Sequence, residues 1–142
     1  MQDSYEPPER AVLVTVDTGA YDYISSLSEL RELAKTAGAE VLDSFVQSRP
    51  APDAATYVGE GKLTEIRAFC EENQVSLLIF DDELTGSQTR NIEDFTGIRA
   101  VDRTTLILDI FAQRARTHEG RLQVELAQQK YRLPRLLGLG TQ

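Results

Sequence analysis

Acidic side chains that could bind a cation or a nucleotide follow two apolar stretches of this chain. Asp17 follows the β-branched run 11–16, and the segment 81–83, Asp-Asp-Glu, follows the apolar run 75–80. If the two runs are neighbouring parallel strands, these carboxylates meet at the carboxyl edge of the sheet, where α/β proteins bind ligands. Oxygen ligands of this kind could hold a hard cation such as Mg²⁺.

Two functions are open for these acids. One is a binding site for an ATP-like nucleotide, whose candidate residues are Asp17, Thr18, Gly19, Asp81 and Asp82. The other is a structural role in turns and helix caps, where Asp is common. A phosphate-accepting receiver domain would also need a fifth strand that carries Lys, and we find neither in the sequence. We therefore assign no metal ligands.

The segment 59–62, Gly-Glu-Gly-Lys, combines glycines with a lysine in a way that could contact phosphate at a helix N-terminus. A phosphate loop of the Walker type needs Gly five residues before the Gly-Lys pair and Ser or Thr after it. Thr56 and Leu63 stand at those positions. Gly59, Gly61 and Lys62 therefore predict either a glycine-rich helix start or a weaker phosphate contact.

A basic C-terminal part follows an acidic part of the chain. Residues 103–142 hold seven Lys and Arg against three Asp and Glu, a net charge of +4, whereas residues 1–102 carry −12. On a continuous helix, Arg114, Arg121 and Arg132 would lie within about 20° of one another and could follow an RNA backbone. The alternative is a solvated helix face whose arginines pair with nearby glutamates. The candidate RNA-binding residues are Arg114, Arg116, Arg121, Lys130, Arg132 and Arg135.

Other residue types exclude several kinds of chemistry. His118 is the single histidine, which rules out Ser-His-Asp catalysis and histidine-rich metal sites. Cys70 shares a helix face with apolar residues, so we expect a buried and unreactive thiol. The N-terminus lacks the pattern of a secretory signal, and no apolar run approaches the ~20 residues of a membrane span. We expect a cytoplasmic protein without membrane contact.

Hydrophobic periodicity predicts an α/β fold. Apolar runs that alternate with amphipathic helices indicate a four-stranded parallel sheet in the order 2-1-3-4, flanked by helices. A polar, proline-rich segment, 47–56, is expected to be an exposed, mobile loop. The expected strands are 11–16, 40–46, 75–80 and 98–101, and the expected helices are 25–37, 62–72 and 85–95.

A long helical segment follows the sheet. From residue 103 to 137 the pattern is helical, with expected breaks near 117–120 and at Pro134. An apolar seam on this helix needs a partner, so we infer a truncated helical hairpin. Dimerisation through the seam is the alternative. The predicted divisions are a flexible leader 1–9, an α/β body 10–102 and a helical arm 103–142.

Several motifs occur in the order found in one protein family. They are Tyr57-Val-Gly-Glu-Gly-Lys-Leu63, Ile79-Phe-Asp-Asp-Glu-Leu84, Val101-Asp-Arg-Thr104, Ile107-Leu-Asp-Ile-Phe-Ala-Gln-Arg-Ala-Arg116 and Glu119-Gly-Arg-Leu-Gln-Val-Glu-Leu-Ala-Gln128. In these motifs the chain resembles the HflX family of ribosome-associated GTPases. Thr105 stands where the family pattern has Gly, and Gly86 stands where Pro is common.

The resemblance implies an N-terminal α/β subdomain, a helical hairpin and then a GTP-binding domain, of which this chain resembles the first part. It further implies a non-catalytic module that binds the large ribosomal subunit and its rRNA, in ribosome splitting or rescue. GTP and Mg²⁺ would belong to the GTPase domain, which would be a partner of this chain together with the second hairpin helix. We expect a monomer. Nucleotide sensing at the carboxyl edge is the alternative function.

Overall fold

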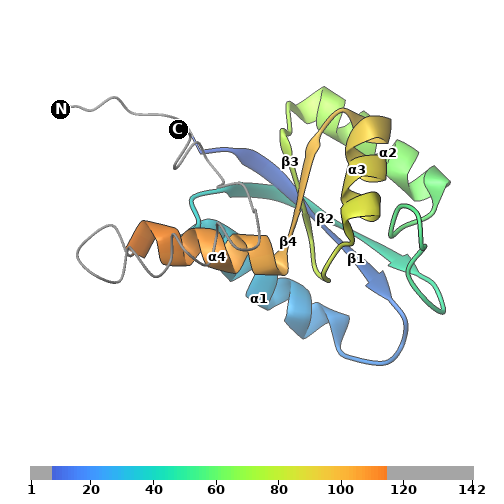
Figure 1. Cartoon of the computed structure of the whole chain (residues 1–142), viewed down its shortest axis with the longest axis horizontal. Helices are drawn as coiled ribbons and strands as arrows, with labels where there is room; N and C mark the ends of the chain where they lie inside the picture. Colours follow the sequence, from blue (N-terminus) through green and yellow to red (C-terminus); the bar gives the residue numbers. More distant parts are fainter. Residues whose placement is uncertain (1–7, 115–142) are drawn as a thin grey trace.

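The computed structural model describes residues 8–114 as a parallel sheet covered by helices on both faces (Figure 1). The predicted α/β class is confirmed, as is the strand order β2-β1-β3-β4. The eight elements, in chain order, are β1 (Arg10–Asp17), α1 (Tyr23–Thr36), β2 (Glu40–Ser48), α2 (Glu60–Asn73), β3 (Leu77–Phe80), α3 (Gly86–Thr96), β4 (Arg99–Asp102) and α4 (Arg103–Arg114).

β1 is a central strand and pairs in parallel with both β2 and β3. Its whole length lies beside β2, from Arg10 opposite Glu40 to Asp17 opposite Ser48. On its other side, residues 11–14 pair with β3. Every residue from 11 to 16 is buried, because helices cover both faces of the sheet.

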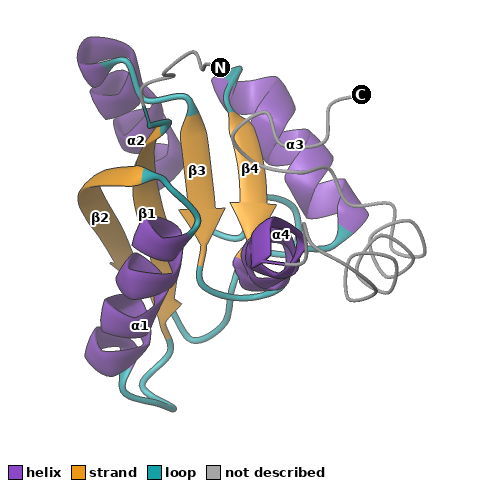
Figure 2. Cartoon of the chain, turned by 90° about the vertical axis from the view of Figure 1, so that its left-hand side faces the viewer, coloured by secondary structure: helices purple, strands orange, loops and turns teal. Residues whose placement is uncertain are grey.

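Two apolar cores lie on the two faces of the sheet. α1 and α4 cover one face and α2 and α3 cover the other (Figure 2). Alternate residues of β1 supply the two cores, with Leu13 facing α1 and Val14 facing α2. Cys70 belongs to the second core and is 1% exposed, so the predicted burial of this thiol is confirmed.

Side-chain caps explain where the helices begin. α1 begins at Tyr23, because Asp22 Oδ1 accepts hydrogen bonds from the backbone N–H groups of Ile24 and Ser25 at 3.1 and 3.3 Å. The predicted helix start at residue 25 is therefore two residues too late. α3 starts after Thr85, which forms a capping box with Gln88.

α4 is the beginning of the predicted arm, and it packs on the body. Leu106 and Ile110 are buried in the same core as α1. Asp102 Oδ1 accepts hydrogen bonds from Thr105 N–H and Thr105 Oγ1–H at 3.0 Å and so caps the helix. The rest of the arm and hairpin lies outside the described residues, and the three-part division of the chain stays a prediction. Within residues 8–114 no helix is long and apolar enough to cross a membrane.

Candidate functional site

The candidate residues that follow β1 and β3 lie at one edge of the sheet, because these two strands are neighbours. Asp17 Oδ1 accepts a hydrogen bond from Gly19 N–H at 3.0 Å, and Thr18 Oγ1 accepts one from Ala20 N–H at 3.3 Å. Gly19 has a φ of +83°, a conformation that favours glycine. Asp17, Thr18 and Gly19 thus build the turn between β1 and α1.

Asp81 forms a buried ion pair with Arg103. Arg103 Nη2 lies 2.7 Å from Asp81 Oδ1, and the exposed fraction of the side chain is 1% for Asp81 and 24% for Arg103. Thr15 Oγ1 donates a hydrogen bond to Asp81 Oδ2 at 3.4 Å. Removing one partner from a buried ion pair costs about 3–5 kcal/mol, because the remaining charge loses its counter-ion. Both oxygens of Asp81 therefore have partners inside the protein.

Arg103 joins three elements through one guanidinium group. Besides Asp81, its Nη2 donates to the backbone O and to Oγ of Ser26, both at 3.0 Å. Its Nη1 lies 3.4 Å from Glu29 Oε1. In the sequence, Arg103 is identified only as part of the basic segment 103–142 and of the motif Val101–Thr104. Its contact with Asp81 is not predicted, because Asp81 is 22 residues away and no local pattern links the two.

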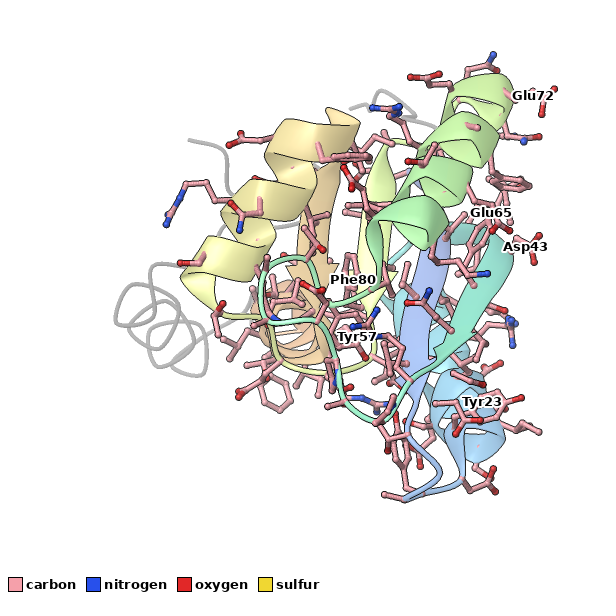
Figure 3. All side chains as sticks on the ribbon, turned by 90° about the vertical axis from the view of Figure 1, so that its right-hand side faces the viewer. Tyr23, Asp43, Tyr57, Glu65, Glu72 and Phe80 are labelled. Atoms are coloured by element: carbon pink, nitrogen blue, oxygen red, sulfur yellow. The ribbon has the colours of Figure 1, made fainter. Side chains whose placement is uncertain are left out.

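Asp82 accepts a hydrogen bond from a buried tyrosine in the loop between β2 and α2. Tyr57 Oη lies 2.5 Å from Asp82 Oδ2 and accepts a hydrogen bond from Val16 N–H at 3.3 Å. The Tyr57 ring lies edge-on against Phe80, with centroids 5.4 Å apart (Figure 3). Burial, followed by the hydrogen bond to Asp82 and the charge of Asp82, raises the pKa of Tyr57 above its ordinary value. The phenol therefore remains a hydrogen-bond donor.

The loop that carries Tyr57 is held by backbone and side-chain contacts. Tyr57 has a φ of +68°, which is uncommon for a residue with a side chain. Asp53 and Tyr57 exchange two backbone hydrogen bonds of 2.9 Å, and Gln88 Nε2 on α3 donates to Asp53 O at 2.9 Å. The sequence predicts a mobile loop over 47–56, but residues 47 and 48 belong to β2, and hydrogen bonds from Gln88 and Asn91 tie Asp53 and Ala55 to α3.

Two hollows lie elsewhere on the surface. One, of about 510 Å³, lies between α3 and β4 and is lined in part by Arg90 and Arg99; the other, of about 400 Å³, lies along α1. None of the five nucleotide candidates lines either of these hollows. Over residues 8–114, no three His, Cys, Asp or Glu side chains are grouped to hold a metal ion. A nucleotide at the carboxyl edge would have to displace the internal partners of Asp81 and Asp82.

The Gly59–Lys62 segment forms the start of α2. Gly59 N–H donates to Gln47 Oε1 at 2.8 Å, and a Cβ at Gly59 would lie 3.1 Å from Arg49 Nη1. Lys62 Nζ lies 3.3 Å from Glu65 Oε1. The first N–H of the segment and its lysine are thus both occupied, which favours the helix-start interpretation. The phosphate contact stays a prediction.

The body presents acidic side chains over β2 and α2. Asp43, Glu65 and Glu72 are exposed on this side of the molecule (Figure 3). Among the candidate RNA-binding residues, Arg114 is the one with a described backbone position, at the end of α4. The others lie outside the described residues: Arg116, Arg121, Lys130, Arg132 and Arg135.

Comparisons with known proteins agree with this architecture. Residues 24–112 match the family described as GTP-binding GTPase N-terminal, and residues 114–142 match the one described as GTP-binding GTPase middle region. The chain is 54% identical to GTPase HflX of Caldanaerobacter subterraneus subsp. tengcongensis, over 100% of this chain and 33% of that protein. It is 45% identical to GTPase HflX of Escherichia coli, over 96% of this chain and 32% of that protein.

Solved structures support the same relationship. A GTP-binding protein from Sulfolobus solfataricus in complex with GDP is similar to this chain with a TM-score of 0.66 and 27% identity. That match covers 89% of this chain and 37% of the other. A complex of SsGBP with GDP matches with a TM-score of 0.69, also over 89% of this chain. The chain spans about a third of the length of the HflX relatives. It therefore belongs to the HflX family of GTP-binding proteins and corresponds to the N-terminal part of that family.

Proposed function

We propose that this chain is the ribosome-binding N-terminal module of an HflX-type GTP-binding protein that acts on the large ribosomal subunit, in ribosome splitting or rescue. The division of charge supports this function. Residues 1–102 carry a net charge of −12, and residues 103–142 carry +4. Ribosomal RNA is a polyanion, so it attracts the arm and repels the acidic body. The arm is then the part of the chain that meets RNA.

In this proposal the arm contacts RNA phosphates without reading sequence. Arginine offers forked donors that match phosphate oxygens, and the candidates Arg114, Arg121 and Arg132 would lie along one helical stripe. GTP hydrolysis, with GTP and Mg²⁺, belongs to the GTPase domain, and this chain has no catalytic role. GTP would control residence on the ribosome through a coupling between the two binding events. The protein would act in the cytoplasm as a monomer.

Co-sedimentation with purified large ribosomal subunits over a salt series tests this function. The unmodified chain is expected to bind saturably, with affinity that falls as salt rises. The Arg121→Glu/Arg132→Glu variant is expected to bind more weakly. The slope of log affinity against log salt is expected to fall by about two for two lost phosphate contacts.

A charge-matched variant of the body serves as the control. Lys35→Glu/Arg90→Glu changes net charge by the same amount at two exposed positions on α1 and α3. Its salt slope is expected to equal that of the unmodified chain. Equal losses in the two variants would show that only net charge matters and would contradict an RNA-binding arm. Absence of binding at every salt concentration would contradict the proposed function as a whole.

A further inference from the structure

The base of α4 is held by two kinds of contact. Leu106 and Ile110 pack into the apolar core beside α1. Asp109 and Ala112 of the same helix are also buried, with exposed fractions of 0% and 4%. Asp102 holds the first turn through Thr105 and also accepts a hydrogen bond from Leu84 N–H at 3.0 Å. These contacts hold α4 against the body.

Arg103 adds an ion pair of defined geometry at the first residue of α4. Its guanidinium is planar, and its donors reach Asp81 at 2.7 Å, Ser26 at 3.0 Å and Glu29 at 3.4 Å. Asp81 is itself fixed to the sheet, because its N–H donates to Val14 O at 3.0 Å. One side chain thus ties α4 to the end of β3 and to α1 at a single angle.

The length of α4 makes that angle matter. Arg114 lies eleven residues beyond Arg103 on α4, which is about 16 Å of helix at 1.5 Å per residue. A tilt of about 10° at Arg103 would therefore displace the end of α4 by about 3 Å, as much as a hydrogen bond is long. A displacement of this size at Arg114, itself a candidate RNA-binding residue, is enough to lose a hydrogen bond to a phosphate.

We propose that the Asp81–Arg103 ion pair is a positioning device that sets the angle at which α4 and the basic arm leave the body. Its benefit for ribosome binding rests on the proposed function, whereas the angle itself does not. Arg103 acts here through geometry, since its donors are occupied by Asp81, Ser26 and Glu29. In this proposal, Asp81, the first carboxylate of the Asp81-Asp82 pair, serves to position α4.

Double electron–electron resonance measures distances between two spin labels, and a distance from α2 to α4 in the 142-residue chain reports this angle. Spin labels are placed at Glu72→Cys on α2 and at Phe111→Cys on α4, both exposed positions, with Cys70→Ala to remove the native thiol. The labelled chain with the ion pair intact is expected to give one narrow distance distribution. Asp81→Asn and Arg103→Gln are expected to broaden it. Unchanged distributions in both variants would overturn the proposal.

Two further variants make the result decisive. Glu29→Gln removes the most exposed partner of Arg103, 74% exposed, and is expected to leave the distribution narrow. Arg103→Lys keeps the positive charge but loses the planar set of guanidinium donors, and it is expected to broaden the distribution less than Arg103→Gln does. Thermal unfolding followed by circular dichroism shows whether each variant folds. If Asp81→Asn or Arg103→Gln does not fold, Arg103→Lys decides: a narrow distribution in that variant overturns the proposal.

Affinity for the ribosome gives a second test, because electrostatics and a positioning role predict affinity changes in opposite directions. Asp81→Asn and Glu29→Gln each remove one negative charge, which by simple electrostatics strengthens binding to a polyanion. A positioning role predicts that Asp81→Asn instead weakens binding about tenfold, a change of about 1.4 kcal/mol, with the salt slope retained. Glu29→Gln is expected to bind at least as well as the unmodified chain. Unweakened binding by a folded Asp81→Asn variant would overturn the positioning role.

The two hypotheses fail separately. If the unmodified chain does not bind large subunits, the proposed function fails, and the spin-label distances still decide whether the ion pair sets the angle. If charge reversal in the arm abolishes binding but the distances do not change with Asp81 or Arg103, the function stands and the positioning device does not.

Discussion

Two adjacent carboxylates after β3 serve different parts of the molecule. Asp81 binds Arg103 at the base of α4, and Asp82 binds Tyr57 in the loop before α2. The next residue, Glu83, accepts a hydrogen bond from Thr104 Oγ1 at 3.3 Å. The acidic segment that suggested a cation or nucleotide site is thus bonded to the protein itself. These internal partners account for acids at this edge without any ligand.

Tyr57→Phe should destabilise the protein. The change removes the donor to Asp82 and leaves the buried Val16 N–H without its acceptor. An unsatisfied buried group of this kind costs about 1–3 kcal/mol, which urea unfolding would measure. Tyr23→Phe removes a hydroxyl from a half-buried tyrosine on α1 and is the matched control, with an expected change below about 0.5 kcal/mol. Equal stability of the two variants would contradict the role of the Tyr57 hydroxyl.

The raised pKa of Tyr57 also predicts that the stability of the protein depends on pH. Its pKa in the folded protein is raised above the value of 10.0 for an ordinary tyrosine, first by burial and then by Asp82. The neutral phenol therefore stabilises the fold fully below pH 10, and this stabilisation is lost as pH rises above 10. The free energy of unfolding should fall more steeply between pH 9.5 and 11 in the unmodified chain than in Tyr57→Phe, by a difference of about 1 kcal/mol. Parallel pH profiles would contradict this assignment.

Nucleotides should not stabilise this chain. Asp81 and Asp82 are bonded to Arg103 and Tyr57, so a nucleotide would have to break those contacts before it gained its own. A thermal-shift titration with ATP and GTP is expected to show no saturable rise in Tm. A saturable rise that Asp17→Asn abolishes would instead support the nucleotide-sensing alternative.

Helix and strand boundaries show which elements sequence can predict. Apolar runs in the sequence identified all four strands, and helical periodicity identified the helices between them. Gly97, with a φ of +72°, ends α3. The sequence predicts a strand over the whole run 75–80, but β3 begins at Leu77. Val75 N–H donates to Cys70 O, so that residue still belongs to the turn after α2. Apolar character predicts burial, and only hydrogen bonding distinguishes a strand from a buried turn.

The candidate site was less predictable than the fold. The convergence of the acids after β1 and β3 follows from strand order alone. Their partners do not, because Arg103 and Tyr57 come from a helix start and a loop whose conformations depend on tertiary contacts. A positive φ at Tyr57 has no local sequence signal, since Gly and Asn are the residues usually found in that conformation.

Two glycines at the start of α2 should respond oppositely to alanine. At Gly59, a Cβ would lie 3.1 Å from Arg49 Nη1, and alanine is also a poor N-cap, so Gly59→Ala should destabilise by about 1 kcal/mol. At Gly61, a Cβ would meet nothing within 4 Å, and alanine should stabilise the helix by about 0.5–1 kcal/mol. Urea unfolding of both variants tests this pair. The same sign in both would show that the two glycines do not differ in this way.

At the scale of the whole molecule, an acidic α/β body supports the first turns of a basic arm. Exposed acids over β2 and α2 leave that side unsuited to RNA, whereas α4 leaves from the opposite face of the sheet. In the proposed function, the body would orient α4 and the basic segment after it would bind RNA.

A chain shortened to residues 1–114 should keep the fold and lose ribosome binding. It retains every described element, while its net charge is −11 because five of the seven basic residues of the segment 103–142 are gone. Circular dichroism should show cooperative unfolding, and co-sedimentation with large subunits should show no saturable binding at 100 mM salt, where the electrostatic term is still strong. Binding equal to that of the 142-residue chain would place RNA contacts in the body instead.

The order of strands in the sheet also has a consequence for how the chain is made. β1 leaves the site of synthesis first, yet its partner β3 ends only at Phe80. At 5–20 residues per second, the roughly 60 residues between them take about 3–12 s to synthesise. During that time the six-residue apolar run of β1 has an open edge that can pair with other nascent chains. The strand at the centre of the finished sheet is therefore the segment that most needs protection by chaperones while the protein is being translated.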